Sequence, residues 1–444
     1  MVSVRSRLNW TQSISLNNYS YLKSSLQEVQ LIIRVICLAP IYIILARILQ
    51  WIINLTYGPY SKDIKQEKAL AYDILWDLKY HFVIQNDINS FLKRYRKVQD
   101  ISVIEEEDVS LYCINKTHFV FVRARPGTDL YNCDKHPFLF LAQHSSAVEL
   151  ITVSLDAMFR YTNNKPQKDG NNITLSYMNG RCGSTLAASM IHRTGQCVVV
   201  SEPWVMLDTL KYAFQGTPKQ RAKRDDYIKA TILAIAKDPK RRYFIKMGMV
   251  TGILVRVMKD ILPGTREMYM YRAWKPTMSS YRKMLGPFAM TILAGRLVPT
   301  CAQEKKHKEI WMRNRVSDPY KKFFFWMFCN MDYFYDEARQ RKNIKSFSYE
   351  SFQMNQEGFI RNLLAHIGIG PEYLKLALSV VSQDSQENSP WSRKKLAGKY
   401  GTIPEETYRW TKKVAKEFGI ESEGKDYTIT NFPNSWETYD GAKN

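Results

Sequence analysis

The chain has 444 residues and a formal net charge of +22, and its 45% hydrophobic and 13% aromatic residues are ample for a large core. The charge favours an acidic partner, such as a polyanionic cofactor, an acidic acceptor or an anionic membrane face. The basic residues are scattered along the chain without an RNA- or DNA-binding motif, which argues against a nucleic acid partner.

The N-terminal segment, residues 1–56, contains an almost wholly apolar run at 31–53 that is long enough to span a bilayer. Arg34 and Arg47 lie near its two ends, where long side chains reach the headgroups, and Trp51 is a candidate interfacial aromatic. We therefore predict an N-terminal membrane helix at 31–53. The alternative is an amphipathic helix that lies on the membrane or packs on the domain. Basic residues flank the run on both sides, so charge does not fix its orientation.

An accessory α+β region is predicted over 57–170. Apolar residues share one face of a predicted helical stretch at 57–100. Beyond it the pattern predicts strands at 109–113, 119–123 and 138–142 and a helix at 147–161. Cys113 and Cys133 bracket a predicted hairpin and are able to pair in an oxidising compartment.

The region 171–400 alternates strands with helices. Strands are predicted at 173–177, 198–200, 243–246 and 268–271, and helices at 183–191, 228–235, 252–261 and 277–285. This alternation indicates an α/β fold of the P-loop type, with a parallel sheet flanked by helices. Residues 401–444 form a C-terminal helix, at 404–418, and a tail.

The most informative stretch is Met178-Asn-Gly-Arg-Cys-Gly-Ser-Thr-Leu186, between the first core strand and its helix. Gly180 and Gly183 permit a tight turn, loop N–H groups point inward, and the helix that begins near Ser184 directs its positive end to the same place. Such a loop binds phosphate or sulfate. No Lys precedes Ser184, as it does in nucleotide triphosphatases, and Arg181 is the loop's one cation, which points away from ATP or GTP hydrolysis. The alternative is an ordinary strand-to-helix turn.

Glu202 follows the second core strand in the sequence Ser201-Glu202-Pro203. The carboxyl ends of parallel strands form the ligand-binding edge of such a sheet, so Glu202 is predicted to lie beside the anion. The alternative is that Ser201 and Glu202 only favour the start of a helix.

Together, Gly-Arg-Cys-Gly-Ser-Thr-Leu and Ser-Glu-Pro resemble the sulfotransferase family, particularly its membrane-bound Golgi members that act on carbohydrates and on protein tyrosine. The resemblance extends over about 173–400. It includes a strand that ends in Arg272, with Ser280 eight residues later on a helix, and the sequence Ser348-Tyr349-Glu350 with the helix after it.

The resemblance implies the cofactor 3′-phosphoadenosine 5′-phosphosulfate (PAPS) and a role for each matching residue. The 5′-phosphosulfate is expected to be held by the loop residues Arg181, Cys182, Gly183, Ser184 and Thr185. The 3′-phosphate is expected to be held by Arg272 and Ser280. Glu202 is expected to be the catalytic base, and Lys246, at the end of another core strand, to stabilise the leaving phosphate. For Arg272 and Ser280 the alternative is a surface Arg and a helix-facing Ser, and for Lys246 it is a solvated strand end.

The segment Asn388-Ser-Pro-Trp-Ser-Arg-Lys-Lys395 is similar to the C-terminal segment with which family members close the cofactor site. Trp391 is expected to anchor it, while Arg393 or Lys394 reaches the 3′-phosphate. The alternative is a solvated basic linker.

The sequence therefore predicts a PAPS-dependent sulfotransferase that acts on a hydroxyl of a carbohydrate or of protein tyrosine, with an acidic glycan or peptide as its acceptor. It is expected to be anchored in the Golgi membrane with a lumenal catalytic domain. No metal is expected, because the spacing of Cys113, His118, Cys133, His136 and His144 matches no standard zinc site. A catalytically inactive nucleotide-binding or scaffold protein is the alternative. A P-loop kinase is disfavoured, since neither a loop Lys nor a Mg²⁺-holding Asp is found.

Overall fold

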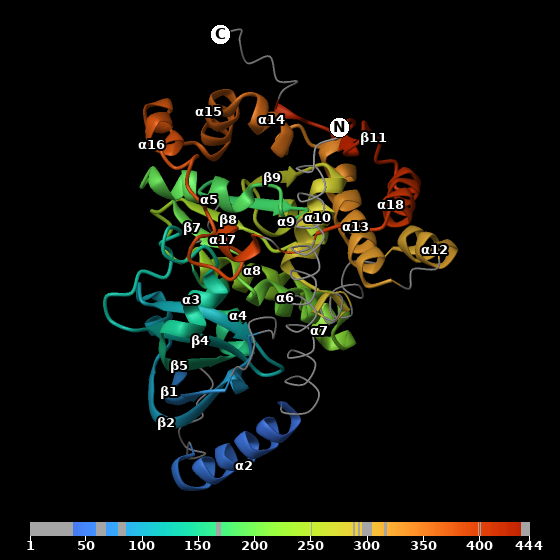
Figure 1. Ribbon diagram of the computed structural model, residues 1–444. Coiled ribbons are helices and arrows are strands. Elements are labelled where there is room, and N and C mark those ends of the chain that lie inside the picture. The colour runs from blue at the N-terminus through green and yellow to red at the C-terminus, as the bar shows by residue number, and fades with distance from the viewer. Residues whose placement is uncertain are drawn as a thin grey trace, which may run out of the picture.

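The computed structural model describes residues 39–58, 68–78, 86–165, 170–249, 251–286, 289–291, 294, 304–314, 318–397, 399 and 401–436. Two five-stranded sheets organise the chain, one with strand order β2-β1-β5-β4-β3 and the other β10-β9-β6-β8-β7. They lie one above the other, and most of the helices surround the second sheet (Figure 1). We call the first the accessory sheet and the second the core sheet.

The core sheet is parallel throughout and is composed of β6 (Ile173–Met178), β7 (Val198–Ser201), β8 (Tyr243–Lys246), β9 (Arg266–Tyr271) and β10 (Lys345–Ser348). Strand β6 lies at its centre, with Ser176 opposite both Lys246 of β8 and Met268 of β9. The predicted parallel α/β core is confirmed.

Alternate residues of these strands enter two different hydrophobic clusters. Val198 and Val200 face one cluster while Val199 faces the other, because successive side chains of a strand point to opposite faces. The first face is covered by α8 (Arg224–Ile235), α9 (Val255–Ile261), α10 (Trp274–Met284), α13 (Pro319–Gln340) and α18 (Glu405–Glu417). The second is covered by α5 (Ser184–Arg193), α15 (Gln356–Ile367) and α16 (Leu374–Leu378).

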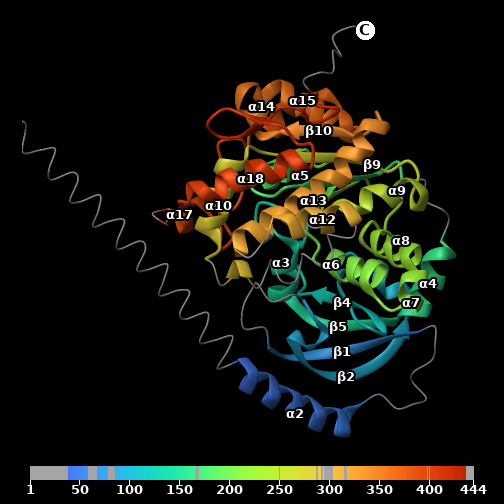
Figure 2. The same cartoon turned by 90° about the vertical axis from the view of Figure 1, so that its right-hand side faces the viewer.

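The accessory sheet is antiparallel: β1 (Lys68–Asp77), β2 (Phe91–Asp100), β3 (Val109–Ile114), β4 (His118–Ala124) and β5 (Ala147–Ser154). Its inner face, with Phe119, Phe121 and Ile151, joins the larger core cluster. Helices α4 (Leu155–Asn163) and α6 (Val205–Leu210) lie between the two sheets (Figure 2). The two sheets thus share one hydrophobic core.

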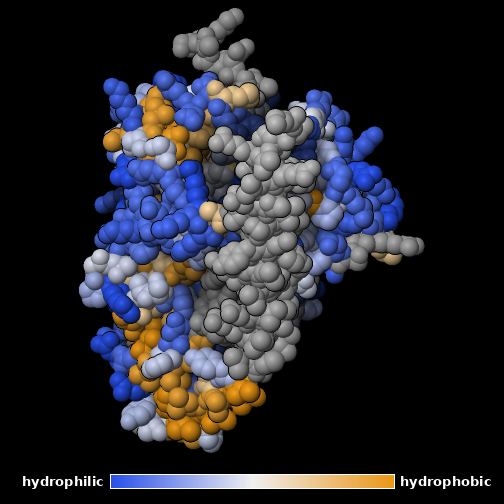
Figure 3. Space-filling model, viewed as in Figure 1, coloured by the Kyte–Doolittle hydropathy of each residue, from blue (hydrophilic) through white to orange (hydrophobic). Residues whose placement is uncertain are grey.

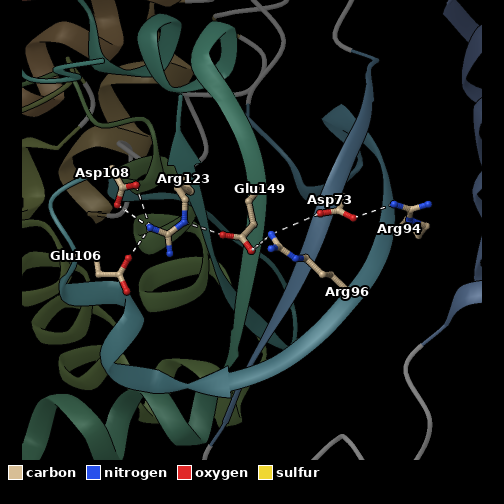
Figure 4. Close-up of polar contacts among 7 residues, drawn as sticks. All are labelled: Asp73, Arg94, Arg96, Glu106, Asp108, Arg123 and Glu149. Atoms are coloured by element: carbon tan, nitrogen blue, oxygen red, sulfur yellow. Dashed lines mark hydrogen bonds and ion pairs between the residues drawn. The ribbon is translucent and has the colours of Figure 1, made fainter. Parts of the chain in front are cut away.

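A chain of ion pairs runs across the accessory sheet from β4 to β2 (Figure 4). Arg123 Nε lies 2.7 Å from Glu149 Oε2, and Arg96 joins Glu149 at 3.4 Å to Asp73 at 3.8 Å. Arg94 closes the chain on Asp73 at 3.1 Å. The carboxylates hold the pKa of Arg123 above its ordinary value, opposing the effect of its burial. Alternating charges on four neighbouring strands favour this register over a slipped one.

Three secondary-structure predictions for the accessory region are wrong. Residues 68–77 and 91–100 are strands rather than parts of a helix, because pairing with β5 and with each other outweighs their helix-like spacing. The predicted strand 138–142 is the start of α3 (Leu139–Ser146). The predicted helix 147–161 begins as β5, whose alternating β-branched residues pair on both sides, and becomes helical only at α4.

The predicted membrane run 31–53 lies partly outside the described residues, and its second part forms α2 (Ala39–Tyr57). No helix in the described part of the chain is long and apolar enough to cross a membrane. Cys113 and Cys133 are free, buried and in different clusters, so they do not form the disulfide that was considered.

Candidate anion-binding site

The loop after β6 has the backbone expected of an anion cradle. Gly180, Arg181 and Gly183 have φ values of 72°, 53° and 82°, in the left-handed region that favours glycine. A Cβ atom on Gly180 would lie 1.7 Å from Tyr281 Oη, and one on Gly183 would lie 2.7 Å from Tyr349 Cδ2. Both glycines are therefore required by close packing as well as by backbone angle.

The loop offers donors to a ligand. Among the described residues, the backbone N–H groups of Gly180, Arg181 and Gly183 donate to no backbone carbonyl. Helix α5 begins directly after them at Ser184, with its positive end toward the cavity that Ser184 and Thr185 line. Cys182 takes no part in the cavity lining: it is fully buried, and burial raises the pKa of its thiol to about 11.

Arg181 and Ser280 are in direct contact. Arg181 Nε donates to Ser280 Oγ at 2.7 Å, which joins the loop to α10, and another nitrogen of the guanidinium donates to Gln386 Oε1 at 2.7 Å. Arg272, at the end of β9, donates to the Arg181 carbonyl at 3.3 Å and lies over the Tyr349 ring at 4.5 Å. The structure therefore brings Arg181 into contact with two residues, Arg272 and Ser280, that lie 91 and 99 positions later in the sequence.

Neither of the two guanidinium groups is neutralised by a direct ion pair in the described part of the chain. Within the described residues no carboxylate forms an ion pair with Arg181 or Arg272, and Arg272 Nε is buried without a hydrogen-bond partner. Burial, with the nearby Arg272 charge, lowers the pKa of Arg181. Two cations this close, without a directly paired carboxylate, are an unfavourable arrangement unless an anion binds between them.

Glu202 and Lys246 form a pair at the adjoining strand ends. Lys246 Nζ lies 2.7 Å from Glu202 Oε1 and donates to Thr185 Oγ1 at 2.9 Å, and it also lies over the Phe138 ring at 5.0 Å. Glu202 has a φ of 54°, an uncommon value for a residue other than glycine that directs its carboxylate into the cavity lining. Lys246 is completely buried and reaches the cavity through Glu202 and Thr185.

The segment 384–397 closes one side of the site. Trp391 packs edge-on against Phe138 with ring centroids 4.8 Å apart, and Gln386 Nε2 donates to Thr185 Oγ1 at 3.3 Å as well as accepting from Arg181. Arg393, at the start of α17 (Arg393–Leu396), lines the cavity. Lys394 is exposed and does not line it, so the structure assigns it no place in the site.

These residues line one cavity of about 950 Å³. Its other half is aromatic and partly acidic: Trp204 stacks on Phe140 at 4.0 Å, and Asp208 lies one helical turn beyond Trp204 on α6. Burial raises the pKa of Asp208 to about 8, although its carboxylate accepts a hydrogen bond from Ile114 N at 3.0 Å.

Sequence reasoning missed Gln386, Phe140, Trp204 and Asp208. The only available signal was that Trp204 and Asp208 closely follow Glu202 in the sequence. Gln386 and Phe140 reach the site through long-range packing that no local pattern encodes.

A second cluster of possible metal ligands, Glu304, His307 and Asp332, lies on α12 (Lys305–Arg313) and α13 and at the residue before α12, outside the cavity. Its carboxylates already pair with cations: Arg256 contacts Glu304, and Lys306 Nζ lies 2.7 Å from Asp332. This arrangement fits an internal charge network better than a metal site. The five Cys and His residues considered for zinc form no such cluster among the described residues.

No protein-family model and no curated sequence matches the chain. Among solved structures it is similar to retinol dehydratase in complex with retinol and 3′-phosphoadenosine 5′-phosphate (PAP), with a TM-score of 0.33, 13% identity, and coverage of 60% of this chain and 86% of that one. A complex of retinol dehydratase with androsterone and PAP gives a TM-score of 0.31 at 13% identity, with the same coverage. Mouse sulfotransferase SULT7A1 with PAP gives 0.32 at 13% identity, covering 60% of this chain and 91% of that one.

Proposed function

We propose that this chain is a sulfotransferase that transfers a sulfuryl group from PAPS to a hydroxyl of its acceptor. The observation that carries the proposal is the pair of guanidinium groups, Arg181 and Arg272, beside a loop with free N–H donors and without a carboxylate partner among the described residues. Such a site suits a ligand with several phosphate or sulfate groups.

The residues present fit PAPS. The cavity is large enough for a nucleotide and an acceptor together, since drug-sized ligands occupy pockets of roughly 300 to 1,000 Å³. The loop N–H groups, Ser184 and Thr185 would hold the 5′-phosphosulfate, and Arg272 with Ser280 the 3′-phosphate. Arg181 contacts Ser280, so it would serve the 3′ end as well as the loop to which it was first assigned. PAPS would supply the activated sulfuryl group.

The pair Glu202 and Lys246 would supply the proton chemistry. Glu202 is ion-paired at the cavity wall, so its carboxylate would accept the proton of the acceptor hydroxyl. Lys246 would hold Glu202 in place and provide positive charge near Thr185 for the leaving phosphate. Arg393 lines the cavity and would add charge from the closing segment, whereas Lys394 does not line it.

For the acceptor we propose a hydroxyl of a carbohydrate or of protein tyrosine. An acidic glycan or peptide is supported by the net charge of +22. The aromatic ring pair in the second half of the cavity favours a ring with little negative charge next to the reacting hydroxyl. A membrane-bound Golgi location with a lumenal catalytic domain is part of the same proposal, on the sequence resemblance. Asn172 is exposed at the start of an Asn-Ile-Thr sequon whose Ile173 and Thr174 are buried in β6. A mass at Asn172 that a glycosidase removes would test lumenal exposure.

The deciding experiment is calorimetric titration of the purified full chain with PAP and with ATP, followed by transfer of radiolabelled sulfate from PAPS to panels of glycans and tyrosine peptides. Binding of PAP with little or no binding of ATP supports the proposal. Preference for ATP would overturn it. PAP binding with no transfer to any acceptor class would favour the inactive, nucleotide-binding alternative.

Arg181→Ala and Arg272→Ala should each weaken PAP binding by about 1.5–3 kcal/mol, roughly 10- to 150-fold, because each removes a charge-assisted hydrogen bond to phosphate. Arg361→Ala is the matched control, since Arg361 is exposed and pairs with Glu357 far from the site. Affinities that stay unchanged in both site variants would remove the guanidinium pair from the binding site.

A further inference from the structure

Helix α2 carries an apolar face that the described residues leave uncovered. Its most exposed side chains are Ile41 (59%), Leu45 (61%), Trp51 (62%) and Leu55 (67%). With Ile44, Ile48 and Ile52 they recur every three or four positions, which places all seven on one side of the helix. No polar residue interrupts this face, and in Figure 3 it forms the hydrophobic patch at the lower end of the molecule.

The opposite side of α2 is fixed to the accessory sheet along its length. Gln50 Nε2 donates to the Lys93 carbonyl at 2.8 Å and Gln50 Oε1 accepts from Lys93 N at 3.0 Å, so its amide pairs with the edge strand β2 as another strand would. Tyr42 Oη donates to the Asp77 carbonyl at 3.4 Å near one end of the helix, and the Arg94 guanidinium lies 5.8 Å from the Tyr57 ring centre at the other. The helix therefore lies alongside the edge strand β2 of the accessory sheet, as Figures 1 and 2 both show.

We propose that α2 is an in-plane membrane anchor, which docks the accessory sheet onto an anionic lipid surface. A lipid interior needs no hydrogen bonds, and this face offers none, whereas a protein partner is usually held by a rim of polar contacts around an apolar centre. Trp51 lies within the apolar face, and Trp76, 66% exposed, lies one residue before the Asp77 carbonyl that Tyr42 contacts. Such aromatic side chains favour the boundary between headgroups and acyl chains.

Basic side chains are exposed on α2 and on the neighbouring edge strand β2. Arg47 is exposed on the flank of α2, and Arg94, Arg96 and Lys97 are exposed on β2. Asp73 pairs with Arg94 and Arg96, and Glu149 pairs with Arg96, so these two carboxylates only partly neutralise the four cations. An in-plane helix brings these cations to the phosphate level, while a helix that crossed the bilayer would draw β2 and its charges in with it.

The test is flotation of the full chain with vesicles of phosphatidylcholine alone and of phosphatidylcholine mixed with phosphatidylserine. We expect binding to the mixed vesicles that weakens with salt, and at least about a tenfold loss of the bound fraction in Ile48→Glu, because a charge replaces a residue that enters the acyl region. Met354→Glu is the matched control: Met354 is 78% exposed on α14 (Tyr349–Met354), away from α2. Thermal unfolding of both variants should match that of the unmodified chain, since both side chains are exposed.

Three results would overturn the proposal. Unchanged flotation of Ile48→Glu would place membrane binding elsewhere in the chain. A dimer in light scattering that Ile48→Glu abolishes, without flotation of the unmodified chain, would make the face an interface between two copies. Quenching of Trp51 fluorescence, taken as the difference from Trp51→Phe, that is stronger by deeply than by shallowly brominated lipids would show a spanning helix. None of these readouts depends on PAP binding, so the anchor and the proposed sulfotransferase stand or fall separately.

Discussion

Lys246 and Glu202 show how the end of a buried strand produces a reactive pair. A completely buried ammonium group is costly unless its charge is balanced, and here a carboxylate, a hydroxyl and an aromatic face surround it. Burying these charges destabilises the folded state, so the pair is weak evidence for a role in stability. Its position at the cavity wall makes chemistry the better explanation.

Glu202→Gln should lower the sulfuryl transfer rate by about 10²- to 10⁴-fold while PAP binds no more weakly than before. The amide keeps the shape of the side chain but cannot accept the proton, and it leaves the Lys246 charge free to attract an anion. Single-turnover rates and calorimetric affinities measure the two effects separately. A variant with the unmodified rate would assign the base to another residue, and a variant that lost PAP affinity as Arg272→Ala does would make Glu202 a binding residue instead.

Asp208 predicts a pH dependence of stability. Burial raises its pKa from 3.8 to about 8, so between these values the folded state retains a proton that the unfolded chain has released. The free energy of unfolding should therefore fall as the pH rises through this interval. In Asp208→Asn the fall should be smaller, because the neutral amide does not titrate and its oxygen still accepts from Ile114 N.

Urea unfolding at a series of pH values from 5 to 8.5 checks this difference. Asp225→Asn is the control, since that side chain is 60% exposed and lies outside the cavity lining. Equal slopes for Asp208→Asn and the unmodified chain would mean that the Asp208 carboxyl does not carry the proton.

At the scale of elements, the loop between β6 and α5 could be predicted because its information is local. Gly180 and Gly183 stand where the backbone adopts positive φ, and the strand before them and the helix after them follow from their own patterns. The assignment of Arg272 and Ser280 came from the resemblance to the sulfotransferase family, whose pattern of a strand-end Arg and a Ser eight residues later is also local. The contact between Arg181 and Ser280 could not be predicted, because it depends on how α10 lies over the loop.

The accessory sheet shows the opposite case. Strands β1 and β2 carry apolar spacings that also suit a helix, and only their pairing with each other and with β5 decides the outcome. A short stretch of sequence around either strand does not contain the strands with which it pairs. Sequence reasoning therefore fails there, where long-range pairing determines the structure.

Gly180→Ala should destabilise the fold by clearly more than the roughly 1–2 kcal/mol that a left-handed alanine costs, and it should abolish PAP binding. The new Cβ would lie 1.7 Å from Tyr281 Oη, so either the loop or α10 must move. Gly195→Ala separates the cost of the left-handed backbone from the cost of the steric clash. Gly195 has a φ of 68° but open space around its Cβ position. Equal losses of unfolding free energy in the two variants, measured by urea titration, would contradict the close packing of loop and helix.

At the scale of the whole molecule, the site is assembled from parts that have little in common in the sequence. The core sheet supplies the loop and strand ends, α3 and the residue before it supply Phe140 and Phe138, and the segment 384–397 supplies Gln386 and Trp391. The Trp391 ring packs against both phenylalanines, with centroids 4.8 Å and 6.4 Å away. A ligand in the cavity thus contacts three parts of the chain at once, and its binding should stabilise their arrangement.

Trp391→Ala tests whether the segment 384–397 closes the site as a unit. The ring holds the segment against the aromatic wall, and without it Gln386 loses the support that keeps it on Arg181 and Thr185. We expect faster tryptic cleavage after Arg393, Lys394 and Lys395, which are exposed, and PAP affinity reduced by about tenfold or more. The control Trp76→Ala, at an exposed position on β1, should change neither the cleavage rate nor the PAP affinity.

In the unmodified chain, saturating PAP should slow the same cleavage, because ordering of the segment removes accessible backbone. Cleavage that is equally fast with and without PAP in the unmodified chain would instead identify 384–397 as a basic linker that happens to rest on the cavity.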